Sequence, residues 1–205
     1  MKFSLKDIPK FVRLAAARKA ERMSEDWDTG RKKLTRPEFC TVFVTPDGLA
    51  VATNGHRLHV APCKNASETA ILLPTDPCAK KSKASDFPAW RTVPEGCAAA
   101  PTIHSVRVMA GAIRGVTVPS KGVALYFAND KVRAERGGFK DRLGSAVINP
   151  RPGEFGFLFD GRYILDALAY LDRVAQVTVD AWGYLDPIRI TRPGGQVAYV
   201  MPMRT

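Results

Sequence analysis

The residues best suited to metal chemistry lie in the first third of the chain. Glu38, Asp47, His56 and His59 are close together in the sequence, and clustered carboxylates and histidines are what a metal-dependent nuclease requires. The other acidic residues are scattered, and the four cysteines contain no C-x-x-C pair, the close spacing that a zinc site needs. We therefore expect no metal, no cofactor and no catalysis, and a nuclease stays open only as an alternative.

Basic residues form a second group with possible chemistry. The chain has 31 lysines and arginines against 20 aspartates and glutamates, a net charge of +11, which favours a polyanionic partner such as nucleic acid. Such side chains can hold phosphates without reading bases, although a solvated helix surface is the other interpretation. The candidates are Lys6, Lys10, Arg13, Arg18, Lys19 and Arg22, followed by Arg31, Lys32, Lys33, Arg107 and Arg114.

The elements that would position these residues begin with a strand, a helix and three strands. Apolar residues at helical spacing predict a helix over residues 7–22, preceded by a short strand over 1–5. Pro46-Asp47-Gly48 and Asn54-Gly55 are strong turn signals. They predict three antiparallel strands over 39–45, 49–53 and 56–61.

The same order recurs at the end of the chain, and a weaker copy lies between. The last copy has a strand over 154–159, a helix over 162–171 and strands over 176–181, 188–192 and 197–201. In the middle copy, 103–115 forms a strand or a short helix, with His104, Arg107 and Arg114 on one stripe of that helix. Strands follow over 123–128, 132–136 and 143–148. The repeat predicts an α+β fold, with antiparallel sheets and helices on one face.

Residues 62–100 interrupt this rhythm with prolines and the run Lys80-Lys81-Ser82-Lys83, and only 70–73 favours a strand. We expect one domain over 1–96, whose Pro- and Lys-rich connector is 64–96, and a second over 97–205. No apolar run approaches the roughly 20 residues of a membrane span. A cytoplasmic protein with reduced thiols is therefore expected.

Four segments of the chain resemble bacterial sliding clamps, the β subunit of DNA polymerase III. The segment 51–58, VATNGHRL, is similar to the family's ATDGHRL, and 87–93, FPAWRTV, to its FPDYRRV connector. The segment 163–168, YILDAL, is similar to YVLDVL, and 198–204, AYVMPMR, to the C-terminal YVVMPMR. The four occur in the family's order.

The resemblance implies a DNA-clamp fold, in which helices line a ring around DNA and sheets lie outside. Residues 97–205 resemble the C-terminal clamp domain, and 1–96 a shortened middle domain; the amino-terminal clamp domain is expected to be absent. Two such chains cannot supply the six domains of a bacterial ring. A homo-oligomer is therefore expected, either a ring of three chains or an assembly that does not close.

The resemblance also implies a hydrophobic cleft that receives short linear peptides from polymerases and the clamp loader. Arg57 and Arg204 would receive peptide carbonyls or carboxylates at its rim, and Gly161, where the family has valine, would make one wall shallower. The residues that match the cleft are Arg36, Phe39, Thr53, Gly55, His56, Arg57 and Leu58 on one wall, Pro88 and Val93 in the connector, and Gly161, Val200, Met201, Pro202, Met203 and Arg204 on the other wall.

The favoured hypothesis is a clamp-like processivity factor without enzymatic activity, in a bacterial cytoplasm and encoded by a bacterium, phage or plasmid. Its expected partners are double-stranded DNA, DNA polymerase and clamp-loader subunits, with no membrane. The alternative is a non-encircling, clamp-derived adaptor or competitor that keeps only the peptide cleft.

Overall fold

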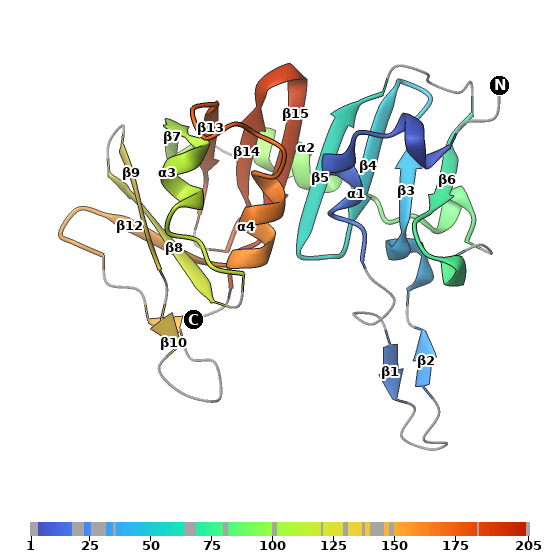
Figure 1. The fold of residues 1–205 in the computed structure, drawn as a ribbon, viewed down its shortest axis with the longest axis horizontal. Helices are drawn as coiled ribbons and strands as arrows, with labels where there is room; N and C mark the ends of the chain where they lie inside the picture. The colour runs from blue at the N-terminus through green and yellow to red at the C-terminus, as the bar shows by residue number, and fades with distance from the viewer. Residues whose placement is uncertain are drawn as a thin grey trace. The chain divides into compact units, whose positions relative to one another are not determined.

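The chain forms two compact units in the computed structural model, Met1–Trp90 (unit 1) and Arg91–Thr205 (unit 2) (Figure 1). The structure describes residues 4–17, 23–25, 32–34, 36–63, 69–79, 82–99, 102–119, 121–128, 131–136, 138–139, 146–147, 150–183 and 185–203. The division falls after Trp90, and helix α2, Thr92–Ala99, runs across the position where we expected the domain boundary.

Unit 1 is built on an antiparallel sheet in the order β6-β3-β4-β5. Its strands are β3 (Thr41–Val44), β4 (Leu49–Thr53), β5 (Arg57–Pro62) and β6 (Ile71–Pro74). The three predicted strands and the strand expected over 70–73 are thus confirmed. The turn between β3 and β4 has Gly48 at φ 79°, a conformation that glycine adopts without a steric penalty. A separate hairpin pairs β1 (Met23–Glu25) with β2 (Lys32–Leu34).

The beginning of unit 1 differs from the prediction. Residues Leu5–Asp7 form a 3-10 turn, in which the Asp7 carboxylate accepts from the Ser4 amide at 2.8 Å, so the strand expected over 1–5 does not include Leu5. Residues 1–3 of that prediction lie outside the described part of the chain. The predicted helix shrinks to α1, Lys10–Arg13, which starts after Pro9. The chain leaves the helix because the amide of Ala17 donates to the carbonyl of Phe39 at 2.8 Å. Residues 18–22 lie outside the described part of the chain.

Unit 2 contains two copies of a strand-helix-strand order. The first copy is β7 (His104–Met109), α3 (Ala110–Arg114), β8 (Gly122–Ala128), β9 (Lys131–Arg136), β10 (Gly138–Phe139) and β11 (Ala146–Val147). The second is β12 (Phe155–Asp160), α4 (Gly161–Ala167), β13 (Gln176–Ala181), β14 (Ile188–Arg192) and β15 (Gln196–Val200). The predicted strands are confirmed over the described residues, which include only 146–147 of the strand expected over 143–148, and 103–115 holds both a strand and a helix. The helix expected over 162–171 is shorter and ends at Ala167.

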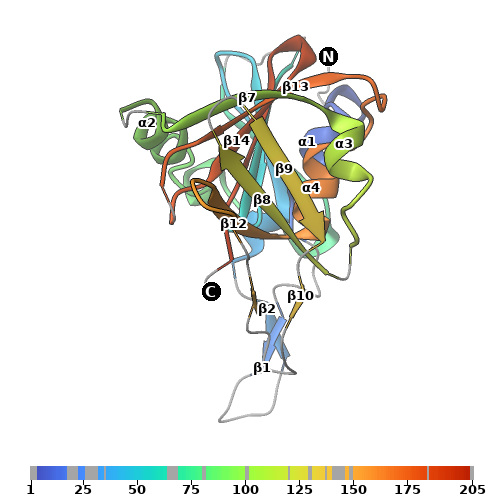
Figure 2. The same cartoon turned by 90° about the vertical axis from the view of Figure 1, so that its left-hand side faces the viewer.

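The two copies of unit 2 exchange their first strands. Strand β7 of the first copy pairs with β13 in the sheet β15-β14-β13-β7, and β12 of the second copy pairs with β8 in the sheet β12-β8-β9. Helices α3 and α4 lie side by side at one side of the unit (Figure 2). The predicted α+β fold with antiparallel sheets is therefore confirmed.

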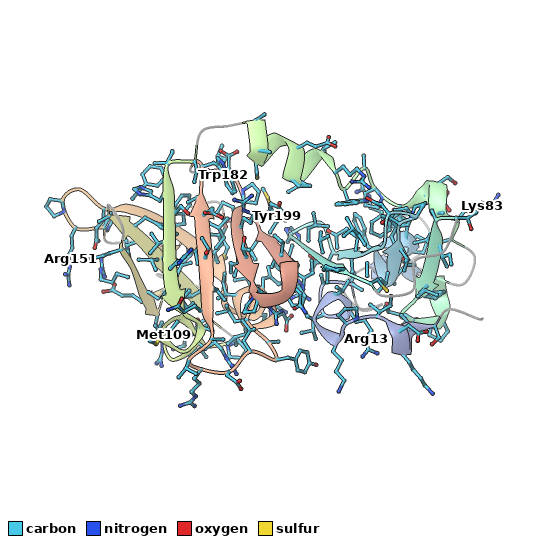
Figure 3. The ribbon with its side chains drawn as sticks, turned by 90° about the horizontal axis from the view of Figure 1, so that it is seen from above. Arg13, Lys83, Met109, Arg151, Trp182 and Tyr199 are labelled. Carbon is cyan, nitrogen blue, oxygen red and sulfur yellow. The ribbon has the colours of Figure 1, made fainter. Side chains whose placement is uncertain are left out.

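Helix α2 lies on the other side of the four-stranded sheet from α3 and α4 (Figure 3). It was not predicted, because Pro94 and the small residues 97–100 favoured a connector; proline is tolerated in the first turn of a helix. Its Cys97 is buried, and burial raises the pKa of that thiol. Cys40 and Cys63 are buried as well.

Candidate functional site

The tip of the β4–β5 hairpin holds Thr53, Gly55, His56 and Arg57 in one hydrogen-bonded turn. The Thr53 hydroxyl donates to the Arg57 carbonyl at 2.7 Å and accepts from the Gly55 amide at 3.0 Å. The Asn54 side-chain oxygen accepts from the amides of His56 and Arg57 at 3.0 and 3.1 Å. Gly55 has φ 89°, so the turn requires glycine. His56 and Gly55 are exposed at this tip, whereas Thr53 is buried.

Two polar side chains of β5 lie beneath α1. The guanidinium of Arg57, a residue with 7% of its surface exposed, donates to the carbonyl of Leu14 at the end of the helix. His59 lies two residues further along the same side of β5; its ring stacks on Phe11 at 4.2 Å, and its Nδ1 lies 2.9 Å from the Phe11 carbonyl oxygen. Arg57, expected at the rim of a cleft, thus already holds the end of a helix.

The other predicted residues of unit 1 differ in exposure. Leu58 is buried opposite Thr53 on the neighbouring strand. Phe39 is buried in a cluster with Ala17, Cys40 and Ala79. Arg36 is exposed and has φ 53°, and its guanidinium carbon lies 5.4 Å from the centre of the Phe39 ring. Arg36 is therefore the accessible member of that pair. Pro88 is half-buried, and its carbonyl accepts from the Trp90 amide at 2.6 Å.

In unit 2, the segment that follows β15 is hydrogen-bonded to strand β12. The amide of Met203 donates to the carbonyl of Leu158 at 2.7 Å, and its side chain packs against Ala124, Tyr126 and Leu158. Val200 is fully buried, whereas Met201 has 36% of its surface exposed. Pro202 is half-buried, and Arg204 lies outside the described residues. Met201 therefore offers a soft, adaptable apolar side chain to a ligand, and Met203 serves partly as core.

Gly161 has a structural reason to lack a side chain. It is the first residue of α4, and its amide donates to the carbonyl of Lys121 at 3.0 Å. A Cβ atom here would lie 2.2 Å from the carbonyl oxygen of Val118 and 2.5 Å from that of Lys121. The close approach of the backbone, which sequence reasoning missed, excludes valine at this position. Val93, the remaining cleft candidate, is half-buried in α2.

The basic candidates of unit 1 divide into three groups. Lys6 and Lys10 are exposed at the start of α1, and Arg13 is half-buried on the same helix (Figure 3). Lys32 and Lys33 belong to β2, where Lys32 is paired in register with Glu25 of β1. The candidates that fall outside the described residues are Arg18, Lys19, Arg22 and Arg31.

The predicted stripe of His104, Arg107 and Arg114 is wrong. His104 and Arg107 lie on strand β7, where an odd spacing places them on opposite faces. His104 is half-buried and stacks on Phe127 at 5.6 Å, whereas Arg107 is exposed. Arg114 is on α3, and its guanidinium donates to the carbonyl of Leu171 at 2.9 Å.

Arg192 is a site residue that sequence reasoning missed. It is buried at the end of β14, and its guanidinium donates to the carbonyl of Ala169, just beyond α4, at 2.7 Å. Burial lowers the pKa of Arg192 to about 10, so it remains charged at neutral pH. In both units an arginine beside a glycine-containing hairpin turn thus holds the carbonyl at a helix end. That placement, next to Gly55 in one unit and Gly194 in the other, is the signal that could have found it.

The described residues contain no group of three or more histidine, cysteine, aspartate or glutamate side chains that could hold a metal ion. Of the residues considered for a nuclease, His56 lies on an exposed turn and His59 is fully buried under α1. No described helix combines the length and the apolar character needed to cross a membrane.

The chain has the fold of bacterial sliding clamps. The DNA polymerase sliding clamp of Caulobacter crescentus matches 95% of this chain and 63% of its own, with a TM-score of 0.59 and 15% identity. The DNA polymerase III β subunit of Thermotoga maritima matches 90% of this chain and 62% of its own, with a TM-score of 0.58 and 16% identity.

The β clamp of Helicobacter pylori, solved with a bound DNA ligase peptide, matches 91% of this chain and 61% of its own, with a TM-score of 0.56 and 11% identity. This chain therefore spans about three fifths of the length of these clamps. No model of a protein family matches the sequence, and no curated protein matches it either.

Proposed function

We propose that this protein is a sliding-clamp-like processivity factor that surrounds or contacts duplex DNA and binds replication proteins through short peptides. The observation that carries the proposal is the clamp fold itself, which extends over 95% of the chain in the comparison with the Caulobacter crescentus clamp. The function of the clamp family is to tether a polymerase to DNA, and tethering does not require the clamp to catalyse a reaction. We accordingly assign no catalytic residue.

Duplex DNA is contacted through phosphates in this proposal, with Lys6 and Lys10 as the first residues to test. Both are exposed, Lys6 in the 3-10 turn and Lys10 at the first position of α1, and the net charge of +11 supports attraction to a polyanion. Binding should weaken steeply as salt rises, because each phosphate contact releases counterions. The variant K6A/K10A should lower duplex affinity and flatten the salt dependence, whereas K83A, an exposed lysine elsewhere in unit 1, should change neither.

The peptide partners are DNA polymerase and clamp-loader subunits, which we expect to bind through the matched cleft residues. His56 and Met201 are exposed members of that set, and the Helicobacter pylori clamp has a DNA ligase peptide bound. Titration of the protein with such a ligase peptide and with peptides from clamp-loader subunits tests this directly. Variants H56A and M201A should weaken binding without loss of the folded state.

Assembly into a homo-oligomer is the third part of the proposal. Among the described strands, β6, β7, β9 and β12 each end one of the two larger sheets and have one neighbour, and the unpaired backbone groups of an edge strand can pair with another chain. Light scattering or native mass spectrometry across concentration measures the state. A discrete trimer or other closed oligomer supports a ring, whereas a monomer at all concentrations favours the non-encircling adaptor.

The deciding experiment is primer extension by a DNA polymerase on a long single-primed template, with and without this protein. Longer products per binding event support the processivity function. Peptide binding without any gain in product length would instead support the alternative, a non-encircling adaptor. The loss of both activities would overturn the whole proposal.

A further inference from the structure

The loop between α4 and β13 exposes an aromatic ring on a strained backbone. Tyr170 has φ 61°, the left-handed region that is unfavourable for a residue with a side chain, and 65% of its surface is exposed. A large aromatic side chain gains nothing from folding when it faces water. The strained backbone at Tyr170 therefore lowers stability without a gain from burial of the ring, which suggests that the ring has a binding role.

The backbone on both sides of Tyr170 is fixed. The guanidinium of Arg192 donates to the carbonyl of Ala169 at 2.7 Å, and that of Arg114 donates to the carbonyl of Leu171 at 2.9 Å. Two arginines from different elements thus hold the peptide groups on either side of Tyr170. The ring is presented by a rigid support, which reduces the entropy lost when a ligand binds.

The C-terminal part of the same loop, residues 173–175, is hydrogen-bonded to the start of α3. The amide of Gly111 donates to the carbonyl of Arg173 at 2.9 Å, and the amide of Ala110 donates to that of Ala175 at 2.9 Å. Between these anchors, Val174 has 75% of its surface exposed, and Arg173 is exposed beside it. Met109, which precedes α3 and is labelled in Figure 3, has 53% exposed. The surface combines an aromatic ring, an arginine and two apolar side chains.

We propose that Tyr170 is a stacking platform for an unpaired DNA base and that Arg173 contacts the adjacent phosphate. An open aromatic face stacks on any base, and a neighbouring arginine supplies the charge for the backbone, the combination that holds single strands without sequence preference. In a duplex the faces of the bases are covered by their neighbours, so the ring selects unpaired nucleotides. The net charge of +11 supports the approach of a polyanion, although Asp172 is also exposed in this loop.

The inference rests on the proposed function only in taking DNA as the partner. At a primer end the template continues as a single strand, so a clamp that holds the duplex through other residues has unpaired bases within reach. Tyr170 then adds a contact that distinguishes a primer–template junction from uninterrupted duplex.

The test uses fluorescence anisotropy with a labelled oligothymidine, a duplex of equal length and the full chain. Y170G should weaken oligothymidine binding by about 5- to 100-fold, the loss of one stacked base, while duplex binding changes less than twofold. Glycine also relieves the left-handed backbone, so Y170G should melt at a higher temperature than the wild type. Y170F, which keeps the ring face, should bind like the wild type, as should L185A, which alters an exposed leucine in another loop of unit 2.

R173A should also lower oligothymidine affinity and reduce its salt dependence. Equal oligothymidine affinity in Y170G and the wild type overturns the inference, as does a wild type that binds only duplex. If Y170G keeps DNA binding and loses stimulation of the polymerase, the loop contacts protein and the inference is again wrong. None of these results removes the proposed function, which fails only when the wild type neither extends the polymerase products nor binds the peptides.

Discussion

The guanidinium of Arg57 donates a hydrogen bond to the carbonyl oxygen of Leu14, and this contact joins the tip of the β4–β5 hairpin to the end of α1. Helix α1 has only four residues, too few to be stable by itself in water. Its place is therefore set by tertiary contacts from β5, namely Arg57 and the buried ring of His59 beneath Phe11. The turn that carries His56 and the helix that begins at Lys10 are therefore joined by the Arg57 contact.

Removing this contact should destabilise the protein. We expect R57A to lower the free energy of unfolding by about 1.5–3 kcal/mol, because it removes a hydrogen bond that involves a charged group and leaves the Leu14 carbonyl without that donor. R136A, at an exposed position of β9, should change it by less than about 0.5 kcal/mol. Urea unfolding followed by circular dichroism measures both. An R57A variant as stable as the wild type would show that the contact contributes nothing.

Restoring the valine of the clamp family at Gly161 should be harmful. The added side chain meets the carbonyl oxygens of Val118 and Lys121, so we expect G161V to lose about 3 kcal/mol or more, or to be insoluble, as in other cases of steric overpacking. The matched control is G96A in α2, where a Cβ atom has no neighbour within 4 Å. Alanine there should stabilise the helix by about 0.5–1 kcal/mol. A soluble G161V with the wild-type melting temperature would contradict the prediction.

Stability should fall at acid pH through Glu154. Hydrogen bonds from the Arg133 guanidinium, at 2.9 and 2.5 Å, and from the Arg151 amide lower the pKa of this carboxyl from 4.5 to about 2. A lowered pKa in the folded state means that the contribution is complete above pH 4.5 and disappears as the pH falls through about 2.

The melting temperature of E154Q should therefore lie below that of the wild type near pH 7 and converge with it near pH 2. The exposed Glu95 of α2 supplies the control E95Q, whose curve should follow the wild type throughout. Parallel curves for E154Q and the wild type over the whole range would refute the role of Glu154.

Substitutions of the two methionines near the end of the chain should affect different properties: Met203 the stability and Met201 the binding of peptide. Met203 packs on Ala124, Tyr126 and Leu158, so M203A should lower the free energy of unfolding by about 1–3 kcal/mol, less than for a fully buried methionine. Met201 is partly exposed, and M201A should leave stability nearly unchanged while it weakens the binding of a ligase peptide. Calorimetry of binding and thermal unfolding on the same samples distinguish the two. If M201A bound the peptide like the wild type, Met201 would not belong to the cleft.

Most strands could be predicted from the sequence because their signals are local. Gly48 and Gly55 mark turns whose backbone conformation requires glycine, and the runs between them have the composition of strands. The order of elements around α4 followed from the same logic. The fold could also be predicted from the resemblance of four short segments to sliding clamps, because those segments include the β4–β5 turn and the end of the last strand.

Only the tertiary structure decided which strands pair and which side chains meet. The exchange of β7 and β12 between the two copies of unit 2 depends on contacts between segments far apart in the chain, for which a local pattern has no signal. The same holds for Gly161, whose lack of a side chain is explained by a carbonyl of another loop. Arg57 and Arg192 are similar cases, because each finds its acceptor on a distant helix end. The sequence specifies turns and strands through short-range sterics, whereas burial and hydrogen bonding over long separations determine the site.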